Sequence, residues 1–446
     1  MASPPRTGPR LAARALSLGL LLAGCPAPHG PSAPSLAAQT IELGRPGVTL
    51  SGVAGDGAMV FAALTAQAPA TRTTIEAIPS ATRAGAPVPA WQAELDGAGG
   101  PLVLAGRTVV AALGSTGTVA GVVVRGEPGA AVVALDAATG AIGWKLAVDA
   151  TEWSVIAGLA ATADGVIVGG SFAGTLRIGA RVVSSAGKAD GFVARLTATG
   201  DVAWLVRVGG PGADAVQGVA AAADRIAIAG TFAAGADLLG QPLPAFDDRS
   251  PFADGFVAEL DAGGARRWAQ AFGGKADDAV AGVAIDARGR IAVAATARDT
   301  VHVGGVDLVA SGLADGLVAW WTPGGAPGPA ILVGGTDFDG LRAIAATGDH
   351  VLVAGFYSGA LRLGDRTLTA GGGDDAFLAE LDPDGGVVQA WPISGEGREE
   401  LTALAAIPGG FVAGLAHTAA ARFGDAALPA PADPLSGAAV IVRALR

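Results

Sequence analysis

The sequence predicts an all-β protein that folds as a seven-bladed β-propeller of four-stranded antiparallel blades. The first observation is a five-residue pattern, apolar–any–Gly/Ala–apolar–Ala/Gly, which begins at Leu50, Val110, Ile156, Val216, Val280, Leu341 and Leu401. Neighbouring copies are 60 to 64 residues apart, except for one interval of 46 residues between Val110 and Ile156. A period of this length, carried by short β-type segments, indicates one supersecondary unit built several times.

The second observation is the composition of the repeat unit. After the pattern at Val216 come strands at Arg225–Phe232, Asp254–Leu260 and Arg266–Phe272, separated by Gly and Asp turns. Short strands rich in Val, Ile, Leu and Ala between such turns are typical of sequential hairpins. A four-stranded sheet that is apolar on both faces must pack against neighbours on both sides, and radial packing of such sheets gives a propeller.

The third observation is how the two ends of the chain complement each other. The seventh unit stops at its third strand, Ala438–Leu445, and a lone strand, Thr40–Leu43, precedes the first unit. We therefore expect one blade to be assembled from both ends, which closes the ring. A linear stack would need polar terminal units, and neither terminal unit has that character.

Two sets of residues predict how the blades meet. The third position of the pattern is small in every copy, which fits an innermost strand near a crowded axis: Gly52, Ala112, Gly158, Gly218, Gly282, Ala343 and Ala403. Trp144, Trp204 and Trp268 share one position in the fourth strand and are expected to pack between blades. Of the neighbours Trp320 and Trp321, one is expected to face outward.

The N-terminal segment predicts export. Residues 1–24 read as a signal peptide, because three arginines and no acid precede an apolar stretch too short to span a bilayer. The stretch ends in Leu22-Ala23-Gly24-Cys25, which resembles the lipobox of bacterial lipoproteins and implies cleavage before Cys25 and lipidation of its thiol. The alternative is an ordinary signal peptide with an incidental cysteine. Cys25 is the only cysteine, so no internal disulfide can form.

The predicted domain organisation follows from these ends. Residues 25–39 form a lipidated, Pro-rich tether, and residues 40–446 form the propeller. We expect a lipid-anchored location at the cell envelope. Because Pro26 rather than Asp follows the cysteine, the outer membrane is preferred over the inner membrane.

The repeat itself resembles a known family. Gly-Gly, an acid before the first strand, and a third strand such as Asp254–Leu260 (DGFVAEL) resemble the bacterial SBBP β-propeller repeat family. The match covers the units from Ile156 to Leu445 and is looser for the first two. It implies an exported or surface-attached propeller and does not itself imply an enzymatic activity. Val132–Leu146 resembles a single quinoprotein-type repeat, which implies no quinone, and we expect no cofactor.

Charge limits the possible partners. The formal net charge is −11, and it falls to about −14 once the three signal-peptide arginines are removed. Such acidity argues against a nucleic-acid partner and against direct electrostatic binding to anionic lipid.

Eight acidic residues form the first candidate site. The first and third strands of a meander run in the same direction, so acids at their starts should crowd one face of the disc: Asp214, Asp278, Asp339 and Glu399 at first strands, and Asp190, Asp254, Asp315 and Asp375 at third strands. Asp also favours turns, because its carboxylate accepts hydrogen bonds from nearby backbone N–H groups. The sequence thus leaves turn chemistry and a site for a cation or cationic partner both open, and metal binding unknown.

The short interval gives the second candidate site. In the second unit, a strand at Thr118–Arg125 should pass to one at Ala130–Asp136 through Gly126–Gly129 alone, without the extra hairpin that full-length units carry on the acidic face. A notch there would admit a partner or ligand near Arg125 and Glu127. The alternative is an ordinary deletion in a surface loop.

No catalytic motif stands out, since the chain has neither Gly-x-Ser-x-Gly nor a phosphate-binding glycine loop. The sequence therefore favours a monomeric, lipid-anchored binding or scaffold module for an envelope protein or glycan, and does not decide whether it catalyses a reaction. The alternative is a periplasmic or surface enzyme, a lyase or hydrolase, with its site at the channel mouth. A close Asp/Glu–His or Asp/Glu–Arg cluster there would favour the enzyme, and a broad acidic or apolar rim the binding module.

Overall fold

The computed structural model describes residues 39–43, 48–67, 70–80, 87–246, 253–424, 426–431 and 437–444, with the side chains of residues 39–40, 42 and 437–444 left out. The chain divides into two compact units, Met1–Leu36 and Ala37–Arg446, and all described residues belong to the second. The predicted signal peptide and Cys25 lie outside them. Across the described ranges, no helix is long and apolar enough to cross a membrane.

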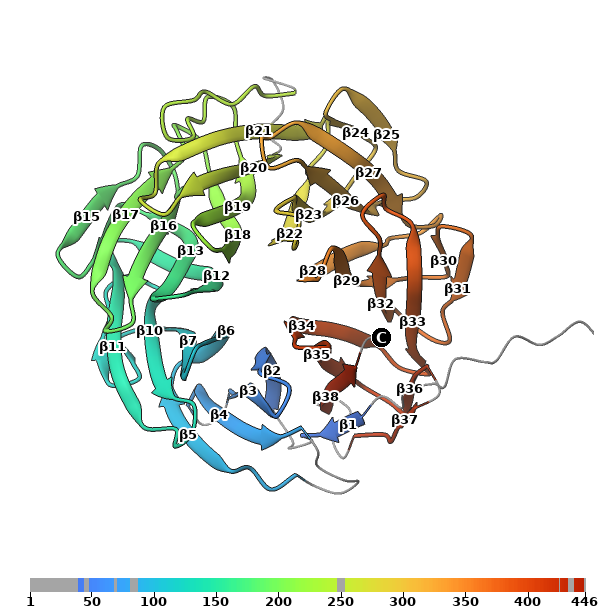
Figure 1. The fold of residues 1–446 in the computed structure, drawn as a ribbon, viewed down its shortest axis with the longest axis horizontal. Coiled ribbons are helices and arrows are strands. Elements are labelled where there is room, and N and C mark those ends of the chain that lie inside the picture. The colour runs from blue at the N-terminus through green and yellow to red at the C-terminus, as the bar shows by residue number, and fades with distance from the viewer. Residues whose placement is uncertain are drawn as a thin grey trace, which may run out of the picture. The chain divides into compact units, whose positions relative to one another are not determined.

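The second unit is a β-propeller, with antiparallel sheets set radially around a central axis (Figure 1). Six four-stranded blades are built from segments that follow one another in the chain. Their strands, from the axis outward, are β2 (Val48–Gly55), β3 (Met59–Ala66), β4 (Arg72–Pro79) and β5 (Trp91–Asp96); β6 (Ala98–Ala105), β7 (Thr108–Ser115), β10 (Gly129–Asp136) and β11 (Ile142–Ala150); β12 (Trp153–Thr162), β13 (Gly165–Ala173), β16 (Asp190–Thr197) and β17 (Val202–Val208); β18 (Ala215–Ala222), β19 (Arg225–Phe232), β20 (Asp254–Asp261) and β21 (Arg266–Gly274); β22 (Ala279–Ile285), β23 (Ile291–Ala297), β26 (Asp315–Trp321) and β27 (Pro327–Val333); and β28 (Gly340–Thr347), β29 (His350–Tyr357), β32 (Asp375–Leu381) and β33 (Val387–Gly395).

One further sheet joins the two ends of this unit. Its strand order is β34 (Glu399–Ile407), β35 (Gly410–His417), β38 (Gly437–Ala444) and β1 (Gln39–Glu42), and it lies in the ring between the sixth blade and the first (Figure 1). β1 pairs with β38 in antiparallel register, with Thr40 opposite Ile441. The predicted pairing of the two chain ends is therefore present.

The innermost strands need small residues because their backbones approach one another closely. A Cβ added to Gly218 would lie 2.9 Å from Gly282 Cα in the next blade, closer than non-bonded carbon atoms pack. A Cβ on Gly52 would lie 2.6 Å from the carbonyl oxygen of Gly100. Steric crowding at the axis thus explains the small residue in the repeated pattern.

The second unit differs from its prediction. Val110 belongs to β7, the second strand of its blade, and the innermost strand is β6, where Gly99, Gly100 and Pro101 break the pattern and the pairing with β7 shifts register between Gly99 and Leu102. The interval of 46 residues therefore compares a second strand with a first strand. The predicted strand at Thr118–Arg125 is wrong, because only the two-residue strands β8 (Thr118–Val119) and β9 (Val122–Val123) form there.

The extra hairpins lie elsewhere than predicted. They are β14 (Thr175–Ile178) with β15 (Arg181–Ser184), β24 (Thr300–Val303) with β25 (Val306–Val309), β30 (Ala360–Leu363) with β31 (Arg366–Thr369), and β36 (Ala421–Phe423) with β37 (Ala426–Leu428). β14, β24 and β36 each pair with the outermost strand of the preceding blade. The hairpins therefore do not stand on a face of the disc. They cover the unpaired backbone groups of an exposed sheet edge, which would otherwise invite edge-to-edge association.

Tryptophans connect neighbouring blades, as the repeat predicted. The indole Nε1 of Trp144 donates to Ala198 O at 2.9 Å, and that of Trp204 donates to Ala262 O at 2.9 Å, each in a turn of the following blade. Trp268 makes the corresponding bond to Pro323 O at 3.2 Å. The prediction for Trp320 and Trp321 is wrong, since both side chains are buried.

Candidate functional site

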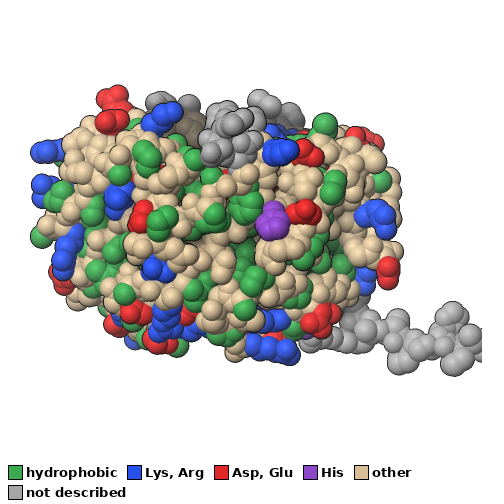
Figure 2. Space-filling model, turned by 90° about the horizontal axis from the view of Figure 1, so that it is seen from above, with side chains coloured by type: hydrophobic (Ala, Val, Ile, Leu, Met, Phe, Trp, Pro, Cys, Tyr) green, Lys and Arg blue, Asp and Glu red, His purple; other side chains and the backbone are tan. Residues whose placement is uncertain are grey.

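The eight predicted acids do not form an exposed face. All are buried, with Asp254 the most accessible at 6 %. Figure 2 shows one side of the ring, where acidic and basic side chains are scattered among apolar ones. The sequence located these carboxylates correctly at strand starts but did not reveal that neighbouring loops cover them.

The acids instead form four pairs across blade interfaces. Each pair joins the start of a third strand to the start of the next innermost strand, 24 residues later: Asp190–Asp214, Asp254–Asp278, Asp315–Asp339 and Asp375–Glu399. We call these the acid pairs. A Cβ added to Gly209 would lie 2.7 Å from both Asp190 Oδ1 and Asp214 Oδ2, so these two oxygens lie within twice that distance of each other.

Backbone N–H groups hold these carboxylates. Asp214 accepts from Gly210 at 2.7 Å and from Ala233 at 2.9 Å, and Asp339 accepts from Gly335 at 2.6 Å and from Ser358 at 3.1 Å. Third-strand acids likewise accept from the loop before them, as in Ser311 N to Asp315 Oδ2 at 2.8 Å. Each pair therefore ties loops of two blades together, the turn chemistry that the sequence allowed. Within the described ranges, no three potential ligands cluster to hold a metal ion.

Burial raises the pKa of carboxyl groups in these pairs. Burial, reinforced by the neighbouring Asp254, raises the pKa of Asp278 to about 7. Burial raises the pKa of Asp339 to about 6, and burial together with the Asp375 carboxyl raises the pKa of Glu399 to about 8. Near neutral pH, Glu399 is therefore mostly protonated and Asp278 about half protonated, whereas Asp339 is mostly ionised. Asp190 also forms an ion pair, with Arg207 Nη1 at 2.7 Å from its Oδ2.

The connection at the predicted notch runs from Thr116 to Pro128, between β7 and β10. It bonds to both neighbouring blades, since Ala120 N donates to Asp96 O at 2.9 Å and Glu127 N donates to Glu152 O at 2.7 Å. Arg125 N donates to Asp149 Oδ1 at 2.9 Å. The strand on which the notch was predicted does not form, and a binding role for Arg125 and Glu127 stays a prediction.

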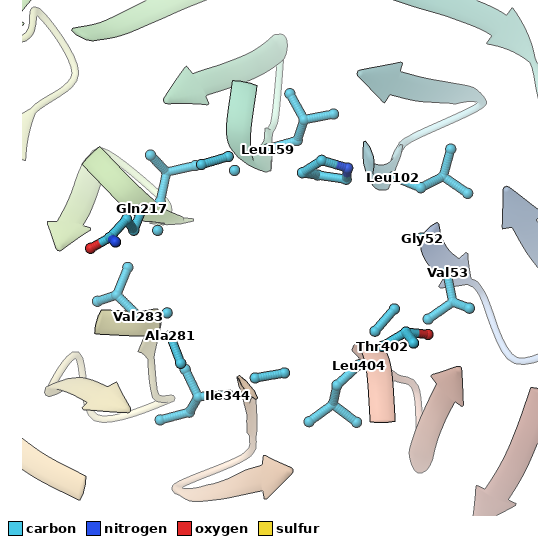
Figure 3. Close-up of a pocket in the computed structure, with 18 of the residues that line it drawn as sticks. Gly52, Val53, Leu102, Leu159, Gln217, Ala281, Val283, Ile344, Thr402 and Leu404 are labelled. Atoms are coloured by element: carbon cyan, nitrogen blue, oxygen red, sulfur yellow. The ribbon is translucent and has the colours of Figure 1, made fainter. Parts of the chain in front are cut away.

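The central channel is lined by aliphatic side chains together with backbone groups and a few uncharged polar side chains. One aliphatic side chain from each innermost strand lines a cavity of about 250 Å³: Val53, Leu102, Leu159, Val219, Val283, Ile344 and Leu404 (Figure 3). Among its described lining residues no side chain is titratable, so the channel wall itself offers no acid–base chemistry. Gln217 is the largest polar residue there.

A second cavity of about 410 Å³ opens beside the channel, on the face where the innermost strands begin, over the fourth to sixth blades. Its volume falls within the range of small-molecule sites. Polar side chains, two arginines and two aromatic rings line it: Gln217, Thr231, Asp277, Thr296, Arg298, Arg342, Phe338 and Phe356. We call this cavity the Arg–Phe cleft.

The arginines of the cleft are held by the rings. Arg298 Cζ lies 5.6 Å from the Phe338 ring centroid and Arg342 Cζ lies 4.6 Å from that of Phe356, while the two ring centroids are 5.5 Å apart. Cations over aromatic faces are attracted electrostatically. The four side chains thus form one stack, Arg–Phe–Phe–Arg, in which both guanidinium groups remain exposed.

Charges in the cleft are only loosely paired. Arg342 Nε lies 3.6 Å from Glu400 Oε1, and within the described ranges Arg298 makes no ion pair. Asp277 is exposed, whereas the adjacent Asp278 is buried beneath the surface. Glu400 also pairs with Arg398, whose Nη2 lies 3.5 Å from Glu400 Oε2, so acids and arginines meet at the edge of the cleft. The polar and charged side chains of the cleft suit the binding of a polar ligand.

Sequence reasoning did not identify the cleft residues. The signal was present as departures from the repeat, because Arg298 stands where other units have Ala173, Ala233, Ser358 or Thr418. Similarly, Phe338 precedes Asp339 where Ala213 precedes Asp214. Residues that interrupt a repeat cannot serve its shared packing, so they deserve inspection as site residues.

Comparison with known proteins finds a similarity of fold and nothing more specific. No protein-family model matches the chain, and no curated protein matches it. Solved structures with similar folds include the propeller domain of the Trilobed protease from Pyrococcus furiosus, with 9 % identity, a TM-score of 0.45 and coverage of 83 % of this chain and 90 % of that one. The Neurospora crassa Pan2 WD40 domain has 8 % identity, a TM-score of 0.45 and coverage of 90 % and 95 %. The Saccharomyces cerevisiae protein Sqt1 has 7 % identity, a TM-score of 0.45 and coverage of 91 % and 98 %.

Proposed function

We propose that this chain is an exported, lipid-anchored propeller of seven blades that binds a protein or glycan of the cell envelope through the Arg–Phe cleft. Lipid attachment at Cys25 follows from the lipobox-like sequence. The seventh blade is the sheet that joins β34, β35 and β38 to β1.

The Arg–Phe cleft is the observation that carries the binding role. Phe338 leaves 37 % of its surface exposed beside two arginines whose guanidinium groups are open to solvent. A cavity lined by aromatic rings with a few convergent polar groups is the usual form of a binding site on a rigid scaffold. The cleft draws its side chains from three blades, so the ring itself fixes their spacing.

Retention of envelope material by the immobilised protein tests this proposal. Phe338→Ala removes the exposed ring and should reduce specific retention at least fivefold, whereas Val123→Ala, which truncates an exposed apolar side chain on β9, should not. Both variants should keep the thermal midpoint of the wild type within a few degrees. Equal retention by wild type and Phe338→Ala would show that the cleft is not the binding site.

A further inference from the structure

We propose that the Arg–Phe cleft binds a carboxylated sugar, of the uronic-acid class, as part of an acidic envelope glycan. This inference rests on the proposed function and identifies the chemistry of its ligand. Three features of the cleft support it: the Arg298 guanidinium, which forms no ion pair among the described residues, the exposed part of the Phe338 side chain, and side-chain oxygens that can accept hydrogen bonds from hydroxyl groups.

The guanidinium groups select for a carboxylate. Arginine presents planar, forked N–H donors that match the two oxygens of a carboxylate. Stacking on Phe338 and Phe356 fixes the position of both groups before a ligand arrives, at 5.6 Å and 4.6 Å from the ring centroids. Arg298 has no ion pair within the described residues, so its charge is available to a ligand.

The exposed part of Phe338, 37 % of its surface, suits contact with an apolar surface of limited size. A pyranose ring offers such a surface on one side while its hydroxyl groups point to the edges. The cavity of about 410 Å³ is large enough for a ligand of this kind and continues toward the channel at Gln217. A compact anion such as phosphate would use the arginines but leave the ring uncovered.

Two acceptors favour a sugar over an acidic peptide. The Gln217 side-chain oxygen is shielded from water and has no hydrogen-bond partner within the described ranges, so it needs a donor. Asp277 presents an exposed carboxylate, and among the described residues its Oδ1 accepts the N–H of Ala253 at 3.1 Å. Hydroxyl groups supply donors to both, whereas the ionised side chains of a peptide rich in Asp and Glu supply none.

Calorimetric titration of the full-length mature protein tests the inference. The probes are trimers of galacturonate, glucuronate and mannuronate, the carboxyl-reduced form of each, and a tri-glutamate peptide. We expect at least one uronate trimer to bind at least tenfold more tightly than its reduced counterpart, with affinity that falls as salt rises.

Two variants link this preference to the cleft. Arg298→Gln and Arg342→Gln should each weaken uronate binding about tenfold or more, because each removes charge-assisted hydrogen bonds to the carboxylate. Arg177→Gln is the matched control, since Arg177 is an exposed arginine on the β14–β15 hairpin away from the cleft. Thermal midpoints of all three should match the wild type.

Several results would overturn the inference: equal affinity for the reduced trimers, unchanged affinity in both arginine variants, tighter binding of tri-glutamate than of every uronate, or no binding of any uronate trimer. These outcomes differ from failure of the proposed function. If Phe338→Ala abolishes retention of envelope material while uronates do not bind, the cleft binds another ligand and only this inference fails.

Discussion

Replacing Asp278 by Asn should make the stability of the protein less sensitive to pH. Asp278 lies beside Asp254 at a blade interface and is 2 % exposed, and its pKa is raised to about 7 by burial and by its neighbour. The amide of Asn resembles the protonated carboxyl and has no charge at any pH. The variant therefore keeps residue 278 uncharged at every pH.

The direction in which stability changes with pH follows from proton linkage. A carboxyl whose pKa is higher in the folded state holds its proton more tightly there, so its contribution to stability is complete below pH 3.8 and is lost as pH rises through about 7. Each pKa unit corresponds to about 1.4 kcal/mol. From pH 5 to pH 8.5 the wild type should lose about 3 kcal/mol through Asp278 alone, and Asp278→Asn should not lose it.

Thermal unfolding at pH 5 and pH 8.5 measures this difference. For a propeller of about 400 residues, 3 kcal/mol corresponds to about 3 °C in the midpoint. The gap between the two pH values should therefore shrink by about 3 °C in Asp278→Asn. Asp365→Asn, in the exposed turn between β30 and β31, should leave the gap as in the wild type. An unchanged gap in Asp278→Asn would refute the assignment of a shared proton to this pair.

Three further outcomes follow from the sequence and the fold. Cys25→Ala should move the protein from the membrane fraction to the soluble fraction, and persistence in the membrane fraction would contradict lipid anchoring. Removal of residues 437–446 deletes β38, which pairs with both β35 and β1, and should abolish cooperative melting in circular dichroism; melting at the wild-type temperature would mean that this sheet does not close the ring. Trp204→Phe removes the 2.9 Å bond to Ala262 O and should lower the free energy of unfolding by about 1 kcal/mol, measured by urea titration, whereas no loss would mean that the bond adds nothing.

The propeller was predictable because its determinants repeat. Small residues recur where the backbones of inner strands meet, as at Gly218 and Gly282. The lone strand predicted at Thr40–Leu43 indicated that it pairs with a strand at the other end of the chain. The strand assignment of the second unit was wrong because an Ala-rich second strand around Val110 satisfies the same five-residue pattern as an inner strand. Pattern alone cannot separate the two when the true inner strand is interrupted at Pro101.

Burial of the acids was not predictable from their positions. A carboxylate at a strand start reads as exposed unless the path of distant loops is known. Here the N–H of Ala233, 19 residues beyond Asp214, closes over its carboxylate. The cleft was not predicted for a related reason. Arg298 and Phe338 come from different blades and become neighbours only when those blades pack against each other.

Members of the acid pairs lie beneath the Arg–Phe cleft, in the same blades. The cleft lies over the blades that carry the pairs, and its residues are direct neighbours of pair members: Asp277 precedes Asp278, Phe338 precedes Asp339, and Thr296 Oγ1 accepts the N–H of Leu341 at 3.3 Å. Backbone N–H groups of Arg298 and Gly274 face the buried Asp278 carboxylate and oppose the rise in its pKa. The acids predicted as the binding surface therefore act beneath it. They support the backbone from which the arginines and aromatic rings of the cleft project.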